Sequence, residues 1–344
     1  MDLPVLDAEV LLHPGEAHPE HHDFVRMHFD PERAQGTVWH YTDAAGLLGI
    51  LNSGQLWATA SLALNDASEV SYGERLIRDV WAAANKEGLP DACRRYTEYA
   101  LDFAFDDFAA EGLFSVSASL DGDLLSQWRS YGGADGFAIG IDAESSLAPL
   151  LPGSLNPLET PPETAPNEAG FHLVFDPTSP PSQLFVVPAW NAVRYDLASQ
   201  YALATAVLQD TIQSTPGPED WEKRTDEWPS HVVSTRSYLL HAAALMKHPA
   251  FVDEREVRLL CSKAYVGDIE EYRASEGRLI PYVPIAKASE SHRWFASDST
   301  ALPIVAVRYG PASDERGLRV AESLLARRGY TNVSIDRSSI PIAF

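Results

Sequence analysis

Nine of the 24 prolines fall within residues 143–183, and this density of proline is incompatible with regular helix. We therefore expect a long loop there, with one short strand at 171–175. The segment lacks the apolar periodicity that a separate hydrophobic core requires, so we expect an excursion from one enlarged domain. The chain then divides into a polar N-terminal extension (1–36), a single domain (37–337) and a C-terminal tail (338–344).

Short β-branched or aromatic runs and longer amphipathic stretches follow one another on both sides of the Pro-rich segment. We expect strands at 37–41, 55–59, 113–119, 136–142, 256–262, 303–309 and 331–336. A helix capped by Thr42 or Asp43 should end at Gly54, and further helices are expected from Asp66 and over 91–111, 197–214, 219–247 and 313–328. Strands and helices do not alternate strictly, which favours an α+β fold over a doubly wound sheet.

The charge balance excludes several classes of partner. The chain of 344 residues carries 49 acidic and 26 basic side chains, a formal charge of −23. This excess disfavours stable, non-specific binding to nucleic acid or to an anionic membrane, because phosphate neutralisation needs clustered Lys and Arg. No apolar run approaches the roughly 18 residues of a membrane span, and the first residues carry acids where a signal peptide carries bases. We expect a cytoplasmic protein.

Metal and standard catalytic motifs are not indicated. Cys93 and Cys261 are too few for a disulfide scaffold or a Cys-based zinc site. Five of the 11 histidines lie between positions 13 and 28, but no carboxylate–His spacing on an expected helix supports a metal site, so a solvated tail is expected. No glycine-rich phosphate loop, G-x-S-x-G or H-E-x-x-H motif occurs.

Polar and aromatic residues at strand and helix ends are the first site candidates. His40, Tyr41 and Thr42 close the first expected strand beside a helix N-terminus, where backbone N–H groups favour an anionic or ribose-bearing ligand. A partly buried, satisfied histidine is the alternative. Asn65, Asp66 and Glu69 fit a helix capping box and are secondary candidates.

Hydroxyl and aromatic pairs form a second set of candidates. Ser115 and Ser117 lie on one face of an expected strand, because side chains alternate with period two. Trp128 and Tyr131 share one face of a helical turn. A half-exposed strand face and a core aromatic pair are the respective alternatives.

The segment Glu254-Arg255-Glu256-Val257-Arg258 is the most informative. Glu254 and Glu256 lie on one face at the start of the expected strand, about 7 Å apart, with Arg255 opposite. Two carboxylates so close are unfavourable unless they serve a cation or a substrate, or face solvent at a sheet edge. In an active site, one could stabilise a developing positive centre and the other orient a nucleophile. Arg258 is a further candidate on this strand.

In order along the chain, these motifs resemble those of an uncharacterised bacterial domain family. That family has a strand ending in H-Y-T, then I-L-x-x-G-x-L-W, an L-N-D-x-x-E helix start, a strand with paired serines, W-x-x-Y before G-F, and a late E-x-E-V-R-L strand. The matching positions are 40–42, 50–57, 64–69, 115–117, 128–131 with 136–137, and 254–259.

That family is similar in layout to the ADP-ribosyltransferase superfamily, whose fold is a split, mixed β-sheet that holds NAD. By this resemblance, His40 would bind the adenosine ribose of NAD. Ser115 and Ser117 would support the nicotinamide side, and Tyr41, Trp128 or Tyr131 could stack on the nicotinamide. Glu256 would be the catalytic carboxylate, and Glu254 would orient the acceptor.

The resemblance implies an enzyme that transfers ADP-ribose from NAD to a macromolecular acceptor, a protein or a nucleic acid, in phage defence or a toxin system. NAD would be consumed as a substrate, and no metal is expected. Two alternatives stay open: an NAD glycohydrolase on the same fold, and a non-catalytic module that senses nucleotides or binds partners.

Overall fold

The structure is a computed structural model that describes residues 6–12, 32–63, 68–105, 112–133, 135–150, 184–186, 189–215, 230–263, 270–275, 277–288, 296 and 301–341. The longer helices are α2 (Ala44–Ser53), α3 (Ser68–Ala83), α4 (Asp91–Ala104), α6 (Leu197–Gln213), α8 (Ser230–Ala244) and α9 (Glu315–Arg327). Shorter turns of helix are α1 (Ala8–Leu12), η1 (Ser61–Ala63), α5 (Leu125–Gln127), the π-helix η3 (Trp128–Gly132) and the 3₁₀ helix η5 (Pro249–Glu254).

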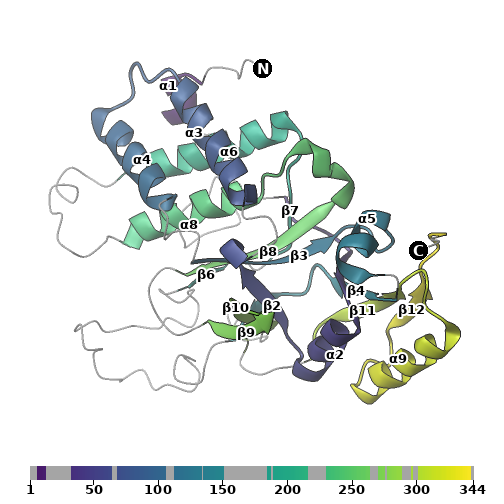
Figure 1. Ribbon diagram of the computed structural model, residues 1–344. Coiled ribbons are helices and arrows are strands. Elements are labelled where there is room, and N and C mark those ends of the chain that lie inside the picture. The colour runs from purple at the N-terminus through teal and green to yellow at the C-terminus, as the bar shows by residue number, and fades with distance from the viewer. Residues whose placement is uncertain are drawn as a thin grey trace, which may run out of the picture.

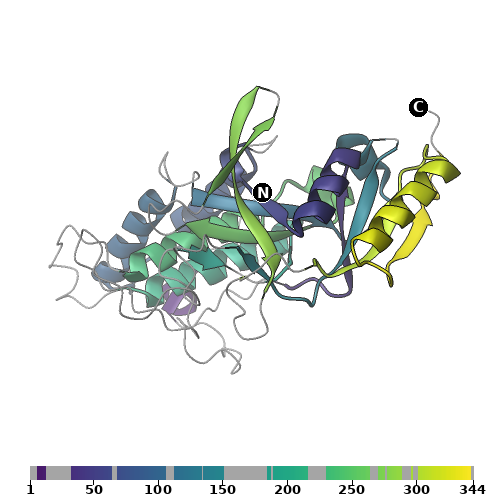
Figure 2. The ribbon, with the colours of Figure 1, turned by 90° about the horizontal axis from the view of Figure 1, so that it is seen from below.

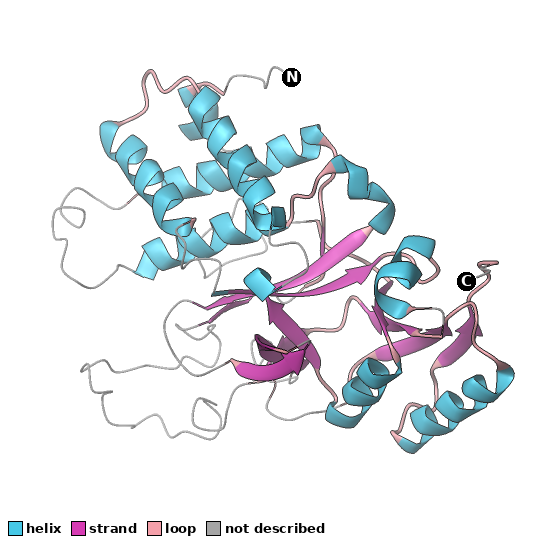
Figure 3. Cartoon of the chain, in the orientation of Figure 1, coloured by secondary structure: helices cyan, strands magenta, loops and turns pink. Residues whose placement is uncertain are grey.

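The strands are β1 (Thr37–Thr42), β2 (Leu56–Ala60), β3 (Leu113–Ser119), β4 (Phe137–Asp142), β5 (Leu147–Pro149), β6 (Leu184–Val186), β7 (Asn191–Ala192), β8 (Glu256–Lys263), β9 (Glu271–Ser275), β10 (Arg278–Lys287), β11 (Ile304–Tyr309) and β12 (Ser334–Arg337). They form one mixed sheet, flanked by helices, and the expected α+β class is confirmed (Figures 1 and 3). Helices α1, α3, α4, α6 and α8 pack together on one side, whereas α2 and α9 lie toward the other end of the sheet (Figure 1).

The sheet divides at β3. Along one edge, β3 pairs antiparallel with β8 over its whole length, from Leu113 opposite Ser262 to Ser119 opposite Glu256. Along the other edge, β1 pairs only at Ser119 and β2 pairs only at Phe114 and Ser115. Strands β1 and β2 therefore diverge in front of the middle of β3, and the sheet opens between them.

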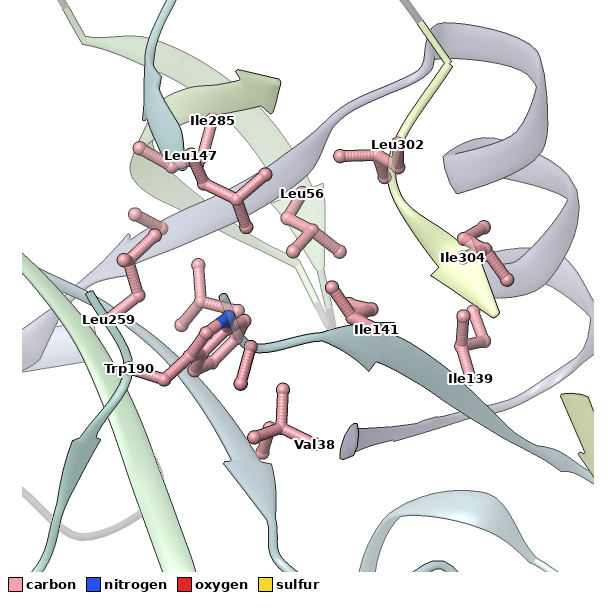
Figure 4. Close-up of a cluster of buried hydrophobic side chains, with 14 of the residues drawn as sticks. Val38, Leu56, Ile139, Ile141, Leu147, Trp190, Leu259, Ile285, Leu302 and Ile304 are labelled. Carbon is pink, nitrogen blue, oxygen red and sulfur yellow. The ribbon is translucent and has the colours of Figure 1, made fainter. Parts of the chain in front are cut away.

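Alternation along these strands separates two hydrophobic cores. Val257, Leu259 and Cys261 of β8 face one core with Val38 and Trp190 (Figure 4), whereas Leu260 faces the helical layer. Phe114, Val116 and Ala118 of β3 face the first core as well, so the serines of β3 lie on the opposite side. Both faces of the central strands are thus covered, except at the opening between β1 and β2.

Local sequence signals explain where several elements start and stop. Asp43 accepts a hydrogen bond from the backbone N–H of Gly46 at 2.7 Å and caps α2, and Gly54 ends that helix in the left-handed region at φ 68°. Asp314 caps α9 in the same way, through the N–H of Gly317 at 2.7 Å. These helices follow the sequence prediction closely because their caps are encoded within a few residues.

The Pro-rich segment differs from the expectation at its start. Residues 147–149 form β5, which pairs with β10, and Ala143 and Leu147 are buried in the first core. Residues 151–183, including the strand expected at 171–175, lie outside the described residues. The N-terminal extension also contributes to the fold, because Leu6 and Leu11 are buried against the helical layer; its histidines lie outside the described residues.

The β9–β10 hairpin is an element that the sequence prediction missed. It projects from the sheet as the light green ribbon of Figure 2, and β10 continues into the sheet beside β2. Pro281 and Pro284 argue against a strand in the sequence, since proline cannot donate to a ladder. No helix in the described part of the chain is long and apolar enough to cross a membrane.

Asp123 ties the C-terminal segment to the helical turn that carries Trp128. Its carboxylate accepts hydrogen bonds from Trp128 Nε1 at 3.0 Å, from the Ser338 hydroxyl, and from the backbone and hydroxyl of Ser339 at 2.8 and 2.9 Å. Burial acts to raise the pKa of Asp123, but the hydrogen bonds from Ser338, Ser339 and Trp128 outweigh it and lower that pKa. Residues 338 and 339, expected in a tail, therefore belong to the fold.

We expect Asp123→Ala to lower the free energy of unfolding by about 2–4 kcal/mol, because it leaves the indole N–H of a fully buried Trp128 without an acceptor. The exposed Asp135 supplies the control, since Asp135→Ala should change stability by less than about 0.5 kcal/mol. Denaturant unfolding at pH 7 measures both. Because the folded-state pKa of Asp123 is depressed, the wild-type advantage should be complete above about pH 5 and fall as the pH drops below about 4.

Candidate functional site

The opening between β1 and β2 is the mouth of a cleft that encloses about 210 Å³. Its floor is the middle of β3, and its walls come from β1, β2, the start of β8, the α5–η3 turn and the segment after α8. The lining residues are Trp39, His40, Tyr41, Trp57, Thr59, Ser115, Val116, Ser117, Ala118, Gln127, Tyr131, Lys247, Glu254, Glu256 and Arg258.

Strand register brings the polar members of this set to one side of the sheet. Ser115 lies opposite Thr59 of β2, and Ser117 lies opposite Arg258 of β8. Paired residues in antiparallel strands point to the same face, so the period-two prediction for Ser115 and Ser117 agrees with their position. The cleft face of the sheet is therefore a row of hydroxyl and charged groups rather than part of either core.

The two glutamates reach the cleft by a different route from the one expected. Strand β8 begins at Glu256, and Glu254 is the last residue of η5, so the two do not share a strand face. Between them Arg255 has φ 49°, in the left-handed region, which turns the chain. This turn, rather than strand alternation, brings both carboxylates into the cleft.

Lys247 is a cation that forms ion pairs with both Glu254 and Glu256. Its Nζ lies 2.7 Å from Glu254 Oε2 and 3.0 Å from Glu256 Oε2. Its backbone is held in place, because the N–H donates to Arg194 O at 3.0 Å and the carbonyl accepts from Gln200 Nε2 at 2.7 Å. Sequence reasoning did not identify Lys247, since nothing local distinguishes a lysine after a helix from an exposed one.

Arg258 completes a network of two acids and two bases. Its Nε donates to Glu256 Oε1 at 2.7 Å and its Nη2 donates to Glu256 Oε2 at 2.8 Å. The Ser117 hydroxyl also hydrogen-bonds the Glu256 carboxylate. Glu254 and Glu256 are thus balanced by Lys247 and Arg258, which is the condition for keeping such charges buried.

The network controls the ionisation of Glu256, which is 7% exposed. Burial alone would raise the pKa of its carboxyl group, but the charges of Arg258 and Lys247 and the hydrogen bonds from Arg258 and Ser117 outweigh it and lower the pKa to about 2. Glu256 is therefore a carboxylate throughout the physiological range.

The side chain of His40 connects β1 to β3 across the opening in the sheet. Its Nδ1 lies 2.9 Å from the backbone oxygen of Ser117, so Nδ1 carries the proton and donates it. Burial lowers the pKa of His40, and the Ser117 contact only partly opposes this. The ring is consequently neutral at pH 7, and its Nε2 is left as a hydrogen-bond acceptor.

The expected aromatic residues divide between core and cleft. Tyr131 is 50% exposed and lines the cleft, whereas Trp128 is 0% exposed. Trp128 therefore does not line the cleft and matches the alternative of a core aromatic pair, since its ring packs edge-on against Tyr41 with centroids 4.8 Å apart and its N–H donates to Asp123. Tyr41 is 6% exposed and borders the cleft; its hydroxyl donates to Asp121 O and accepts from Leu124 N, both at 2.9 Å.

The remaining candidates lie away from the cleft or cannot be described. Thr42 ends β1 opposite Phe137 and does not line the cleft. Asn65 and Asp66 lie outside the described residues, and Glu69 is part of α3 with an undescribed side chain. Trp57, which is 42% exposed at the cleft, was missed as a site residue although the quoted I-L-x-x-G-x-L-W motif ends on it.

Two features of the cleft bear on what it can hold, its side-chain ligands and its volume. Among the described residues, no group of three or more His, Cys, Asp and Glu could hold a metal. The volume of about 210 Å³ lies below the roughly 300–1,000 Å³ of pockets that bury a whole drug-sized ligand. The cleft therefore has room for part of such a ligand rather than for all of it.

A comparison with protein families found one match, to a family described as a protein of unknown function (DUF2971), over residues 127–259. The matched stretch contains Lys247, Glu254, Glu256 and Arg258, but not the β1–β3 part of the cleft. No curated protein and no solved structure matched the chain. The match is consistent with an uncharacterised family.

We expect Lys247→Met to lower the free energy of unfolding by about 2–4 kcal/mol, because Glu254 would lose its ion pair with Lys247 and Glu256 would keep only its ion pair with Arg258. Lys247→Met/Glu254→Gln, which restores charge balance, should recover part of the loss. Lys287→Met removes an exposed lysine and serves as the control. Denaturant unfolding of these variants and of Glu254→Gln completes a double-mutant cycle; strict additivity would mean that Lys247 and Glu254 do not interact.

Proposed function

We propose that the cleft binds NAD and that the protein transfers ADP-ribose from NAD to a macromolecular acceptor. One observation carries the proposal: the sheet opens between β1 and β2, and His40, Ser117 and Glu256 meet there from three strands that are far apart in sequence. A split sheet with these residue types at its opening is the arrangement that the resemblance to ADP-ribosyltransferases implies.

Glu256 supplies what cleavage of the nicotinamide–ribose bond needs. That reaction develops positive charge on the ribose ring, and a fixed carboxylate beside the ribose 2′-hydroxyl stabilises the developing charge. With its pKa lowered to about 2, Glu256 is charged without any proton having to leave. Its pairing with Arg258 holds it in position before the substrate arrives.

Lys247 gives Glu256 a way to accept the substrate. Arg258, Lys247 and Ser117 occupy the hydrogen-bonding positions of Glu256. Lys247 lies closer to Glu254, at 2.7 Å, so its ammonium can remain paired there while a ribose hydroxyl takes its place on Glu256. Glu254, which is more exposed than Glu256, is then available at the rim to orient an acceptor.

Two other side chains extend the ligand contacts. The neutral His40 ring presents Nε2 as an acceptor for a ribose hydroxyl. Tyr131 and Trp57, which are half-exposed at the cleft, can stack against a planar ring in place of the buried Trp128.

A second candidate function is a nucleotide-binding module without turnover. The observation in its favour is that every strong hydrogen-bonding position of Glu256 has a partner within the protein. In that case the network is a structural ion cluster, and the cleft binds a nucleotide without cleaving it.

Glu256→Gln separates these functions. Gln keeps the shape of the side chain but carries no charge, so we expect NAD turnover to fall by on the order of 10²–10³ while NAD affinity is largely kept. Glu254→Gln should suppress transfer but spare release of free ADP-ribose. Chromatography of labelled NAD incubated with cell lysate measures the products.

Asp253→Asn is the matched control, because Asp253 is an exposed acid of the same η5 turn; its turnover should equal the wild type's. Thermal melts check that each variant is folded. Undiminished turnover in Glu256→Gln would sink the mechanism, and a wild type that binds NAD without consuming it would favour the binding module.

A further inference from the structure

Beyond the carboxylate network, a second polar cluster lies at the β2 end of the cleft. Arg273 reaches from β9 across β10, and its Nη2 donates to Thr59 Oγ1 at 3.3 Å. Thr59 in turn lies opposite Ser115 of β3. A row of three polar side chains on the cleft face therefore runs from the projecting hairpin to the floor of the cleft.

Two atoms of this row are buried without a partner. The Ser115 hydroxyl and the Nε–H of Arg273 are both inaccessible to solvent and make no hydrogen bond. Leaving such groups unsatisfied costs about 1–3 kcal/mol each, and native proteins keep few of them. Both lie beside Thr59, which lines the cleft, so the unsatisfied donors gather at one spot rather than being scattered.

Charge favours an anion at this spot. The Arg273 guanidinium lies 5.5 Å from the centre of the Trp57 ring, and no carboxylate of the described residues forms an ion pair with it. Glu271, on the same face of β9, accepts instead from the Tyr282 hydroxyl at 3.0 Å. The carboxylate network is neutral, so the charges at this end of the cleft are those of Arg273, which forms no ion pair with a described residue, and of Glu271, which is hydrogen-bonded by Tyr282 instead.

We propose that Arg273, Thr59 and Ser115 form a phosphate-binding subsite of the cleft. Guanidinium and hydroxyl donors are the groups that hold a phosphate. Ser115 and Ser117 are two residues apart on β3, about 7 Å, which is comparable to the reach from the anomeric carbon of a ribose to its 5′-phosphate. A ribose beside Ser117 and Glu256 would thus place its phosphate beside Ser115 and Arg273. The choice of a ribosyl phosphate as ligand rests on the proposed function.

The test compares two ligands that differ only in the phosphate, nicotinamide riboside and nicotinamide mononucleotide, by calorimetric titration of the full chain. The wild type should bind the mononucleotide at least about 10-fold more tightly. Arg273→Gln should remove most of that preference, and Arg273→Lys should keep part of it. Arg278→Gln, at an exposed arginine of the same hairpin, should keep all of it.

Ser115→Ala gives a readout that a structural role would not produce. Because the Ser115 hydroxyl has no partner, its removal should leave the melting temperature unchanged or higher, yet weaken binding of the mononucleotide. Lower stability with an unchanged ligand preference would contradict the subsite. Equal losses for both ligands in Arg273→Gln would likewise assign Arg273 to structure and overturn the proposal.

Inorganic pyrophosphate separates this proposal from the proposed function. Binding of pyrophosphate that Arg273→Gln abolishes, in a protein that leaves NAD uncleaved, would support the subsite and count against the transferase. If the protein cleaves NAD but Arg273→Gln leaves the affinity for pyrophosphate unchanged, the transferase is supported and the subsite is overturned. A wild type that binds neither pyrophosphate nor the mononucleotide would overturn the subsite.

Discussion

The hydrogen-bonding pattern of β3 is the constraint on which the rest of the structure depends. One edge of β3 is paired completely with β8, and the other is divided between the end of β1 and the start of β2. The complete edge fixes Ser117 opposite Arg258 and so aligns the serines with the charged residues of β8. The divided edge leaves room in front of those residues. If a single strand paired along the whole of that second edge, the sheet would not open in front of these residues.

The charged network shows how each buried charge in this space is given a partner of opposite sign. Two acids and two bases at bonding distance make the cleft face neutral, and Lys247 contacts both acids at once. A ligand that displaces one contact therefore leaves Lys247 with another. In contrast, Arg273, Thr59 and Ser115 have hydrogen-bonding capacity to spare. The cleft thus has two halves. In the half around Glu256, the charged groups are hydrogen-bonded to one another and fixed in position. In the half around Arg273, Thr59 and Ser115, hydrogen-bond donors are available for a ligand.

Much of the fold can be predicted from local patterns, because strands such as β3 and capped helices such as α2 are encoded within a few residues. The expectations that failed depend on distant contacts. Trp128 looks like a site aromatic in the sequence, but its partner Asp123 and the C-terminal serines draw it into the core. Strand β10 is hidden by Pro281 and Pro284, and Lys247 acquires its role only when η5 folds back on it. No periodicity in the sequence suggests the hydrogen bond between the His40 side chain and the Ser117 backbone, because β1 and β3 are not paired at these residues.

The order of assembly follows from the same pairing of β3 with β8. During synthesis, β1, β2 and β3 leave the ribosome well before β8, which begins at residue 256. Until then, β3 lacks its one complete partner and the chain lacks Glu256. Lys247 and Glu254, which come just before β8, are among the last cleft residues to be made. Contacts so distant in sequence form slowly and late. The cleft is therefore incomplete in a nascent chain, and a product truncated before η5, which begins at Pro249, would carry His40 and the serines with neither Glu254 nor Glu256 facing them.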